Sequence, residues 1–201
     1  MPIAPLMIEH RLIERMVKLM ERHVQTISSS SRADTHFIGS AVDFIRAYAD
    51  RCHHGKEEDI LFRELAGKKM APAHAKMMEE LLHEHVEARE VTAKLNHANE
   101  AYIREEPGAL EHIRLHMSRL IDFYPVHIEK EDRHFFIPVM DYFTRQEQEE
   151  MLQAFYEFDR KLVHDRYRDV VEAFEATEKP KGLECYGVRE PPGDRPCGAM
   201  R

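Results

Sequence analysis

The chain has 201 residues and a formal net charge of −8, with 43% hydrophobic and 33% charged residues. This length suits one domain with a sizeable core, and the negative charge argues against a nucleic-acid-binding protein, which needs a basic surface. Gly is scarce at 8 residues and Trp is absent, whereas Glu, Lys, Leu, Ala and Met are abundant, which indicates helices. Histidine is unusually frequent, at 14 residues.

The sequence gives no sign of a membrane or secreted protein. No apolar run approaches the roughly 20 residues that span a bilayer, and the N-terminal MPIAPLMIEH lacks the basic region of a signal peptide. The three cysteines, Cys52, Cys185 and Cys197, form no C-x-x-C pair and no disulfide framework. We therefore expect a cytoplasmic protein with reduced thiols, no membrane and no nucleic-acid partner.

Turn-forming and capping residues divide the chain into five segments with helical periodicity. Asp34 is a good N-cap after a run of serines, Pro72 suits a first helical turn, and Pro107-Gly108 is a further break. Thr144 and Glu147 form a capping box. These signals predict helices at about 6–27, 34–66, 72–105, 109–137 and 145–177.

The predicted architecture is all-α. Four long helices with short connections indicate an up-down-up-down four-helix bundle over residues 1–143. The fifth helix, within 144–178, is expected to pack on the bundle. Residues 179–201 are rich in Pro and Gly, and we expect an irregular tail there.

Each bundle helix has one histidine on its apolar stripe, in place of a nonpolar residue: His10, His54, His85 and His127. Two stripes continue one turn later with a glutamate, Glu58 or Glu131, on the same helix face. A carboxylate buried beside an imidazole is costly unless something compensates, and a bound metal does so. Imidazole and carboxylate ligands inside a bundle suit iron or manganese, with zinc as a further alternative.

The spacing of the four histidines places them at one height in the bundle. The midpoints of successive pairs fall at position 32, between 69 and 70, and at 106, and each lies in a break between helices. The motif H-x-x-x-E-D-x-x-F also occurs twice, starting at His54 and, 73 residues later, at His127. Four imidazoles and two bridging carboxylates supply eight donor atoms, so two six-coordinate metals that share a bridging oxygen keep up to two open positions.

Four segments resemble the hemerythrin family, specifically its hemerythrin-like HHE cation-binding domains: EHRLIE at 9–14, CHHGKEEDILF at 52–62, LLHEH at 81–85 and HIEKEDRHFF at 127–136. The resemblance covers roughly residues 5–140. It implies that His10, His54, His85 and His127 are terminal ligands and that Glu58 and Glu131 bridge two iron ions, which also share an oxo or hydroxo bridge.

The sequence departs from the respiratory hemerythrins, which carry a paired H-x-x-x-H on the third helix and an Asp on the fourth. Here the third helix offers only His85 on its stripe, which argues against simple reversible O2 carriage. His134 is a candidate fifth histidine. Further candidates beside the centre are Glu14, Glu57, Tyr48 and Tyr124. The other histidines are interpreted as surface residues: His23, His36, His53, His74, His83, His97, His112, His116 and His164.

These observations lead us to expect a protein that binds or senses O2 or NO at a carboxylate-bridged di-iron site in the bundle core. Its expected partners are this small ligand, or peroxide, and a redox partner. A di-iron enzyme that handles NO or peroxide, or that repairs iron centres, is one alternative. Repair proteins with a similar ligand pattern carry a short Cys-containing domain before the bundle. Here His10 lies too near the N-terminus to leave room for such a domain, which argues against the repair alternative. An iron-binding or iron-sensing protein is the other alternative.

Overall fold

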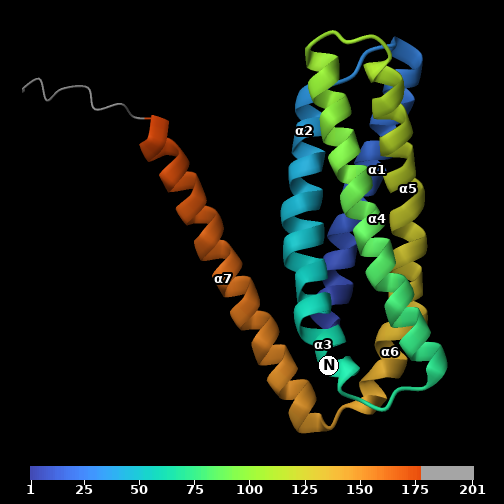
Figure 1. The fold of residues 1–201 in the computed structure, drawn as a ribbon, viewed down its shortest axis with the longest axis vertical. Coiled ribbons are helices and arrows are strands. Elements are labelled where there is room, and N and C mark those ends of the chain that lie inside the picture. Colours follow the sequence, from blue (N-terminus) through green and yellow to red (C-terminus); the bar gives the residue numbers. More distant parts are fainter. Residues whose placement is uncertain (178–201) are drawn as a thin grey trace, which may run out of the picture. The chain divides into compact units, whose positions relative to one another are not determined.

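The computed structural model describes the backbone of residues 1–177 and the side chains of residues 1–161. Within these residues the chain is helical and contains no strand (Figure 1). The chain divides into two compact units, the first of which is Met1–Leu162. The predicted irregular tail, 179–201, and the side chain of His164 lie outside the described residues.

The first unit is built on the predicted four-helix bundle (Figure 1). Its first and third members are single helices, α1 (Ile3–Ser30) and α4 (Pro72–Ile103). The second and fourth are continuous helical runs of several segments: α2 (Thr35–Phe44), η1 (Ile45–His54), η2 (Glu57–Phe62) and α3 (Arg63–Ala66), then α5 (Ala109–Glu129), η3 (Lys130–Phe135) and α6 (Phe136–Val139). A short 3₁₀ turn, η4 (Met140–Tyr142), precedes the additional helix α7 (Arg145–Thr177).

The helix starts follow the predicted capping chemistry. The carboxylate of Asp34 accepts a hydrogen bond from the backbone N–H of Phe37 at 3.0 Å, and Pro72 lies in the first turn of α4. Before α7, the Glu147 carboxylate accepts from the backbone N–H of Thr144 at 2.8 Å, and the Thr144 hydroxyl accepts from the backbone N–H of Glu147 at 3.3 Å. The capping box is therefore confirmed.

Three segments of the bundle, η1, η2 and η3, are π-helical rather than α-helical. The π-turn is wider because its hydrogen bonds join residues five apart. In an α-helix, residues at steps of four drift by about 40° per step around the axis. In the second helical run, five residues at steps of four are all buried: Ile45, Ala49, His53, Glu57 and Leu61. The wider turns keep these positions on one face.

This geometry corrects the predicted stripe of the second helical run. A 3.6-residue period predicts a buried stripe that includes Phe37, Phe44 and Tyr48, but these three side chains are only half-buried. The buried residue follows the predicted one by one position at Ile38 and Ile45, and precedes it by one position at His53 and Glu57. From Ile45 onward, the reason is that the buried residues recur at steps of four through η1 and η2 instead of following a 3.6-residue period.

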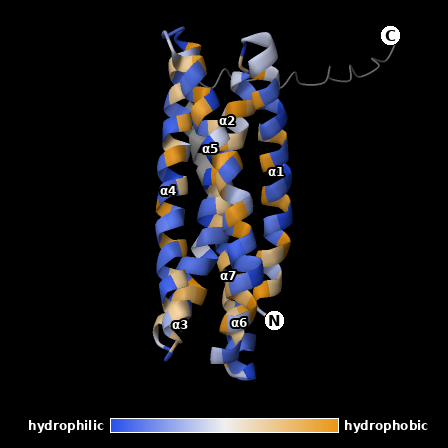
Figure 2. Cartoon of the chain, turned by 90° about the vertical axis from the view of Figure 1, so that its right-hand side faces the viewer, coloured by the Kyte–Doolittle hydropathy of each residue, from blue (hydrophilic) through white to orange (hydrophobic). Residues whose placement is uncertain are grey.

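Two apolar clusters fill the interior. Cluster I consists of Ile13, Val17, Met20, Ile27, Ile38, Ala41, Val42, Ile45, Ala49, Val91, Leu95, Ala98, Ile113, Met117, Leu120, Tyr124 and Ile128. Cluster II consists of Ile3, Leu6, Ile60, Leu61, Phe62, Leu65, Leu81, Phe135, Phe136, Val139, Met140, Phe143, Met151 and Phe155, so the first half of α7 belongs to it. Figure 2 shows hydrophobic and hydrophilic residues alternating along the bundle helices, as expected when one face is buried.

A buried polar layer separates the two clusters. On α1, His10 lies between Leu6 of cluster II and Ile13 of cluster I. On the second helical run, His53 and Glu57 lie between Ala49 and Ile60, which belong to clusters I and II respectively.

No helix in the described residues is long and apolar enough to cross a membrane.

Candidate metal centre

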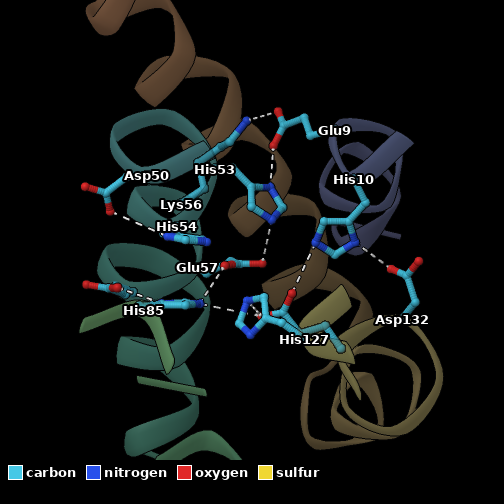
Figure 3. A network of polar contacts seen from close by, with 12 residues as sticks. Glu9, His10, Asp50, His53, His54, Lys56, Glu57, His85, His127 and Asp132 are labelled. Atoms are coloured by element: carbon cyan, nitrogen blue, oxygen red, sulfur yellow. Dashed lines mark hydrogen bonds and ion pairs between the residues drawn. The ribbon is translucent and has the colours of Figure 1, made fainter. Parts of the chain in front are cut away.

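Seven side chains from all four bundle members meet in the polar layer (Figure 3). They form two groups, and within each group one donor atom per residue lies within 4.8 Å of the others. The three-histidine group consists of His54, His85 and His127. The two-histidine group consists of His10, His53, Glu57 and Glu131. All seven side chains are buried, and the carboxylates of Glu57 and Glu131 are fully so.

Each of the two carboxylates faces both groups. Oε1 of Glu57 lies 3.2 Å from Nε2 of His53, and its Oε2 lies 3.5 Å from Nε2 of His85. Oε2 of Glu131 lies 3.1 Å from Nε2 of His10, and its Oε1 lies 3.4 Å from Nε2 of His127. With one oxygen toward each ligand set, each of these carboxylates would bridge two metal ions if both were bound there.

The donor atoms of the cluster lack hydrogen-bond partners within the described residues. They are Nε2 of His10, His53, His54, His85 and His127, and both carboxylate oxygens of Glu57 and Glu131. Buried polar atoms are nearly always hydrogen-bonded, and each one left unsatisfied costs about 1–3 kcal/mol. Two metal ions would satisfy all of them, because every one is a known metal-ligand atom. The residues present therefore fit a dinuclear centre.

On the opposite edge of each imidazole, Nδ1 faces a second carboxylate. The pairs are His10–Asp132 at 2.7 Å, His53–Glu9 at 2.9 Å, His54–Asp50 at 3.5 Å, His85–Glu58 at 2.7 Å and His127–Glu84 at 2.8 Å. Ligating histidines typically donate their other N–H in this way, which fixes the ring and turns Nε2 toward the metal. Four of the five histidines form this hydrogen bond, whereas Nδ1 of His54 lies 3.5 Å from Asp50 without forming one.

A cation holds each of these outer carboxylates in turn. Arg11 pairs with Asp132, Lys56 with Glu9, Lys130 with Glu84, and Arg89 with both Asp50 and Glu58 at 2.7 Å each. The buried ligands are thus supported by a ring of charge pairs that reaches the surface of the bundle. Such support holds the outer carboxylates in place.

The two halves of the bundle repeat this arrangement. On the second and fourth helical runs the matching pairs are His53/His127, Lys56/Lys130, Glu57/Glu131 and Glu58/Asp132, each 74 residues apart. On α1 and α4 they are Glu9/Glu84 and His10/His85, each 75 residues apart. The exception is His54, whose counterpart is the apolar Ile128. This one difference gives three histidines to one group and two to the other.

The charges of the metal-free cluster follow from these contacts. Burial would lower the pKa of His10, but its contacts with Asp132 and Glu131 outweigh burial and raise the pKa to about 10. Burial likewise opposes a rise at His85, yet Glu131 and Glu58 raise its pKa to about 10. By contrast, burial and the neighbouring histidines hold the pKa of His54 well below its usual value. His54 is therefore neutral at pH 7.

Five of the six ligands expected from the sequence lie in this cluster: His10, His54, His85, His127 and Glu131. Glu58 does not, and this corrects the expected position of its side chain. Its Oε1 accepts from Nδ1 of His85 and from Arg89, and the side chain is 25% exposed. The buried carboxylate is the preceding residue, Glu57. The cause is the one-position shift of the buried face in the π-helical region.

His53, interpreted from the sequence as a surface residue, is 1% exposed and belongs to the two-histidine group. The repeat in the sequence aligned His54 with His127, whereas the contacts match His53 with His127. A signal was present in the sequence: apolar or ligand-type residues recur at steps of four through Ala49, His53 and Glu57. That spacing deviates from the 3.6-residue period on which the stripe was drawn.

The remaining candidates lie outside the cluster. His134 is exposed, and Glu14 forms an ion pair with Arg11 at 3.0 Å. Tyr48 is half-buried and stacks on Phe44 at 5.0 Å between ring centroids. Tyr124 is fully buried, and its hydroxyl has no hydrogen-bond partner among the described residues.

A cavity of ≈ 290 Å³ adjoins the three-histidine group. It is lined by Ile45, Arg46, Asp50, His54, Ala88, Arg89, Thr92 and Tyr124. Since a water molecule takes about 30 Å³ in the liquid, the cavity has room for several small molecules.

Comparison with known protein families agrees with the architecture of this site. The family model described as the hemerythrin HHE cation binding domain matches residues 1–137, which include every member of the cluster. The chain matches no curated protein and no solved structure at a significant level. Because the family model covers more than half of the chain, the chain belongs to the hemerythrin HHE cation-binding family.

Proposed function

We propose that this protein holds two iron ions in the polar layer and binds a small diatomic ligand, O2 or NO, at one of them. The observation that carries the proposal is the position of Glu57 and Glu131, each with one carboxylate oxygen toward each histidine group. Family membership supports cation binding at this place. Iron, when bound, would supply a redox-active centre that accepts exogenous ligands.

The donor sets favour ligand binding on one side. The three-histidine group offers three imidazoles and one oxygen from each of Glu57 and Glu131, which makes five donors. The two-histidine group offers two imidazoles and two oxygens, which makes four. If one oxygen from solvent bridges both ions, the first is six-coordinate and the second keeps one open position. We therefore assign ligand binding to the two-histidine side.

The residues around the centre orient its ligands and exclude water, but they do not themselves bind the diatomic ligand. The outer carboxylates Asp132 and Glu9 fix the rings of His10 and His53, so both Nε2 atoms stay turned inward. Clusters I and II border the layer above and below and limit the entry of water. A redox partner is expected to set the oxidation state of the irons.

The test is an optical titration of the iron-loaded protein with azide and with NO, and with O2 for the ferrous form. We expect the spectrum of wild-type protein to change with saturable dependence on each ligand. The His53→Gln variant should lose this response more than the His54→Gln variant, because His53 belongs to the side with the open position. An iron-loaded protein whose spectrum ignores all three ligands would contradict the proposal.

The same preparation distinguishes the alternatives. Multiple turnovers of NO or peroxide, lost in Glu131→Gln, would assign an enzymatic role instead of ligand binding. Iron binding without response to any ligand, together with strong stabilisation of the fold by iron, would favour iron sensing.

A further inference from the structure

Lys56 is the one fully buried cation among those that hold the outer carboxylates. Its Nζ pairs with Glu9 of the bundle and, at 2.8 Å, with Oδ1 of Asp159 on α7. The matching residue of the repeat, Lys130, pairs with Glu84 but is 23% exposed, and its second carboxylate, Glu80, is 3.8 Å away on α4. The two halves of the repeat therefore differ in the source of the second carboxylate. Lys56 receives it from α7, whereas Lys130 receives it from α4.

Other contacts hold α7 at the same place. Gly55 faces Phe158 so closely that a Cβ there would lie 2.7 Å from Cζ of the ring. The thiol of Cys52 donates to Oδ1 of Asp159 at 3.4 Å. Asp159 is thus positioned by the close packing of its neighbour Phe158 on Gly55. Lys56 and Cys52 also donate to its carboxylate.

A continuous chain of polar contacts connects Asp159 to the metal site. Lys56 contacts Oε1 of Glu9, and Oε2 of the same carboxylate lies 2.9 Å from Nδ1 of His53. The Nε2 atom of His53 then faces Oε1 of Glu57 at 3.2 Å. Figure 3 shows Lys56, Glu9 and His53 in this order. Because Lys56 is shielded from water, its position is set by its two carboxylate partners.

We propose that Asp159 is a positioning residue for the two-histidine side of the centre: through Lys56 and Glu9 it fixes the ring of His53, so that seating of α7 and ligand binding at that metal are coupled. This inference rests on the proposed function, since His53 is taken as a ligand. It adds a role for α7, which lies beyond the residues that the family model matches. Coupling of this kind is reciprocal, so metal binding should also strengthen the seating of α7.

The repeat supplies a matched control. Asp159→Asn removes the second carboxylate from Lys56, and Glu80→Gln removes the corresponding carboxylate from Lys130. Asp159→Glu keeps the charge and serves as the rescue variant. Both positions are partly exposed, at 40% for Asp159 and 45% for Glu80, so the variants should fold, which circular dichroism and thermal unfolding of the metal-free proteins will check.

The first measurement is titration of each full-length variant with Co²⁺ against a competing chelator. Loss of a direct outer partner lowers metal affinity by 10–100-fold, so loss of a partner one contact further away should cost less, about threefold to tenfold. We expect Asp159→Asn to weaken one of the two Co²⁺ sites by this factor and to weaken azide binding to the iron form. Glu80→Gln should stay within twofold of wild type, and Asp159→Glu should recover most of the affinity.

The second measurement is proton NMR of the Co²⁺-loaded proteins, in which the Nδ1 proton of a ligand histidine is strongly shifted. The His53 signal is identified by its loss in His53→Gln. It should move or broaden in Asp159→Asn and stay unchanged in Glu80→Gln, a pattern that mere loss of stability would not produce.

The outcomes separate this inference from the proposed function. A wild-type chain that binds no metal overturns both. A wild-type chain that binds two, with Asp159→Asn matching it in affinity and in the His53 signal, overturns only the role of Asp159. Equal effects of Asp159→Asn and Glu80→Gln would also overturn it, because they would show that α7 has no special link to the site.

Discussion

Glu57 and Glu58 are adjacent in the chain, yet their carboxylates face opposite edges of the same imidazole ring. Oε2 of Glu57 lies 3.5 Å from Nε2 of His85, whereas Oε1 of Glu58 lies 2.7 Å from its Nδ1. The first carboxylate is fully buried in the cluster, and the second is 25% exposed and also bound by Arg89. The two residues therefore have different expected roles, as a ligand and as a support of a ligand.

Glu58→Gln should weaken metal binding without changing the number of sites. Loss of the carboxylate that orients His85 is expected to lower metal affinity by about 10–100-fold. Competition with a chelator of known affinity measures this change. A variant that retains full affinity would show that the His85–Glu58 contact does not support the site.

The sequence predicted most of the fold because the helix signals are local. Asp34, Pro72 and the Thr144–Glu147 capping box begin helices where expected, since each acts within one turn of its own position. Stripes on α-helical segments also located His10 and His85. The prediction lost register between Ile45 and Phe62, because π-helical turns there change which residues share a face.

The outer charge pairs were beyond sequence reasoning for a different reason. Glu9, Glu84 and Asp132 look like ordinary solvated residues on their own helices. Each finds its histidine on another helix, at separations of 44, 43 and 122 residues. Only the packing of the bundle brings them together, although the repeat of Glu9 at Glu84 was visible in the sequence.

Metal binding should release protons at pH 7 to 8. In the metal-free chain, Asp132 and Glu131 raise the pKa of His10 to about 10 despite its burial, and Glu131 and Glu58 do the same for His85. Both rings are then protonated at neutral pH and must lose a proton to bind a metal. Calorimetric titration in buffers of different ionisation enthalpy counts these protons. Binding with no proton release would contradict the assigned charges.

The same shifts predict how the stability of the metal-free protein depends on pH. A histidine whose pKa is raised from 6.5 to about 10 stabilises the folded state fully below pH 6.5, and this contribution is lost as the pH rises toward 10. Chemical unfolding of the metal-free protein should show falling stability across that window. The decline should be smaller in His10→Gln, which removes one of the two groups, and an equal decline in both proteins would argue against it.

Gly55→Ala should destabilise the packing of α7. The added Cβ would lie 2.7 Å from Cζ of Phe158, and overpacking of this kind typically costs about 1–3 kcal/mol. Gly39→Ala is the matched control, because the nearest atom to its added Cβ is 3.9 Å away, so it should be neutral or stabilise the helix by about 0.5–1 kcal/mol. Urea unfolding compares the two. Phe158→Ala in the Gly55→Ala background should recover part of the loss, and no recovery would place the strain elsewhere.

The number of irons per chain tests most directly whether Glu57 and Glu131 bridge a dinuclear centre. The protein is loaded with ferrous iron without oxygen, desalted, and analysed for iron and protein content. We predict two irons per chain for wild type and for Glu58→Gln, and at most one for Glu57→Gln. One iron or none in wild type, or two in Glu57→Gln with fewer in Glu58→Gln, would contradict the account.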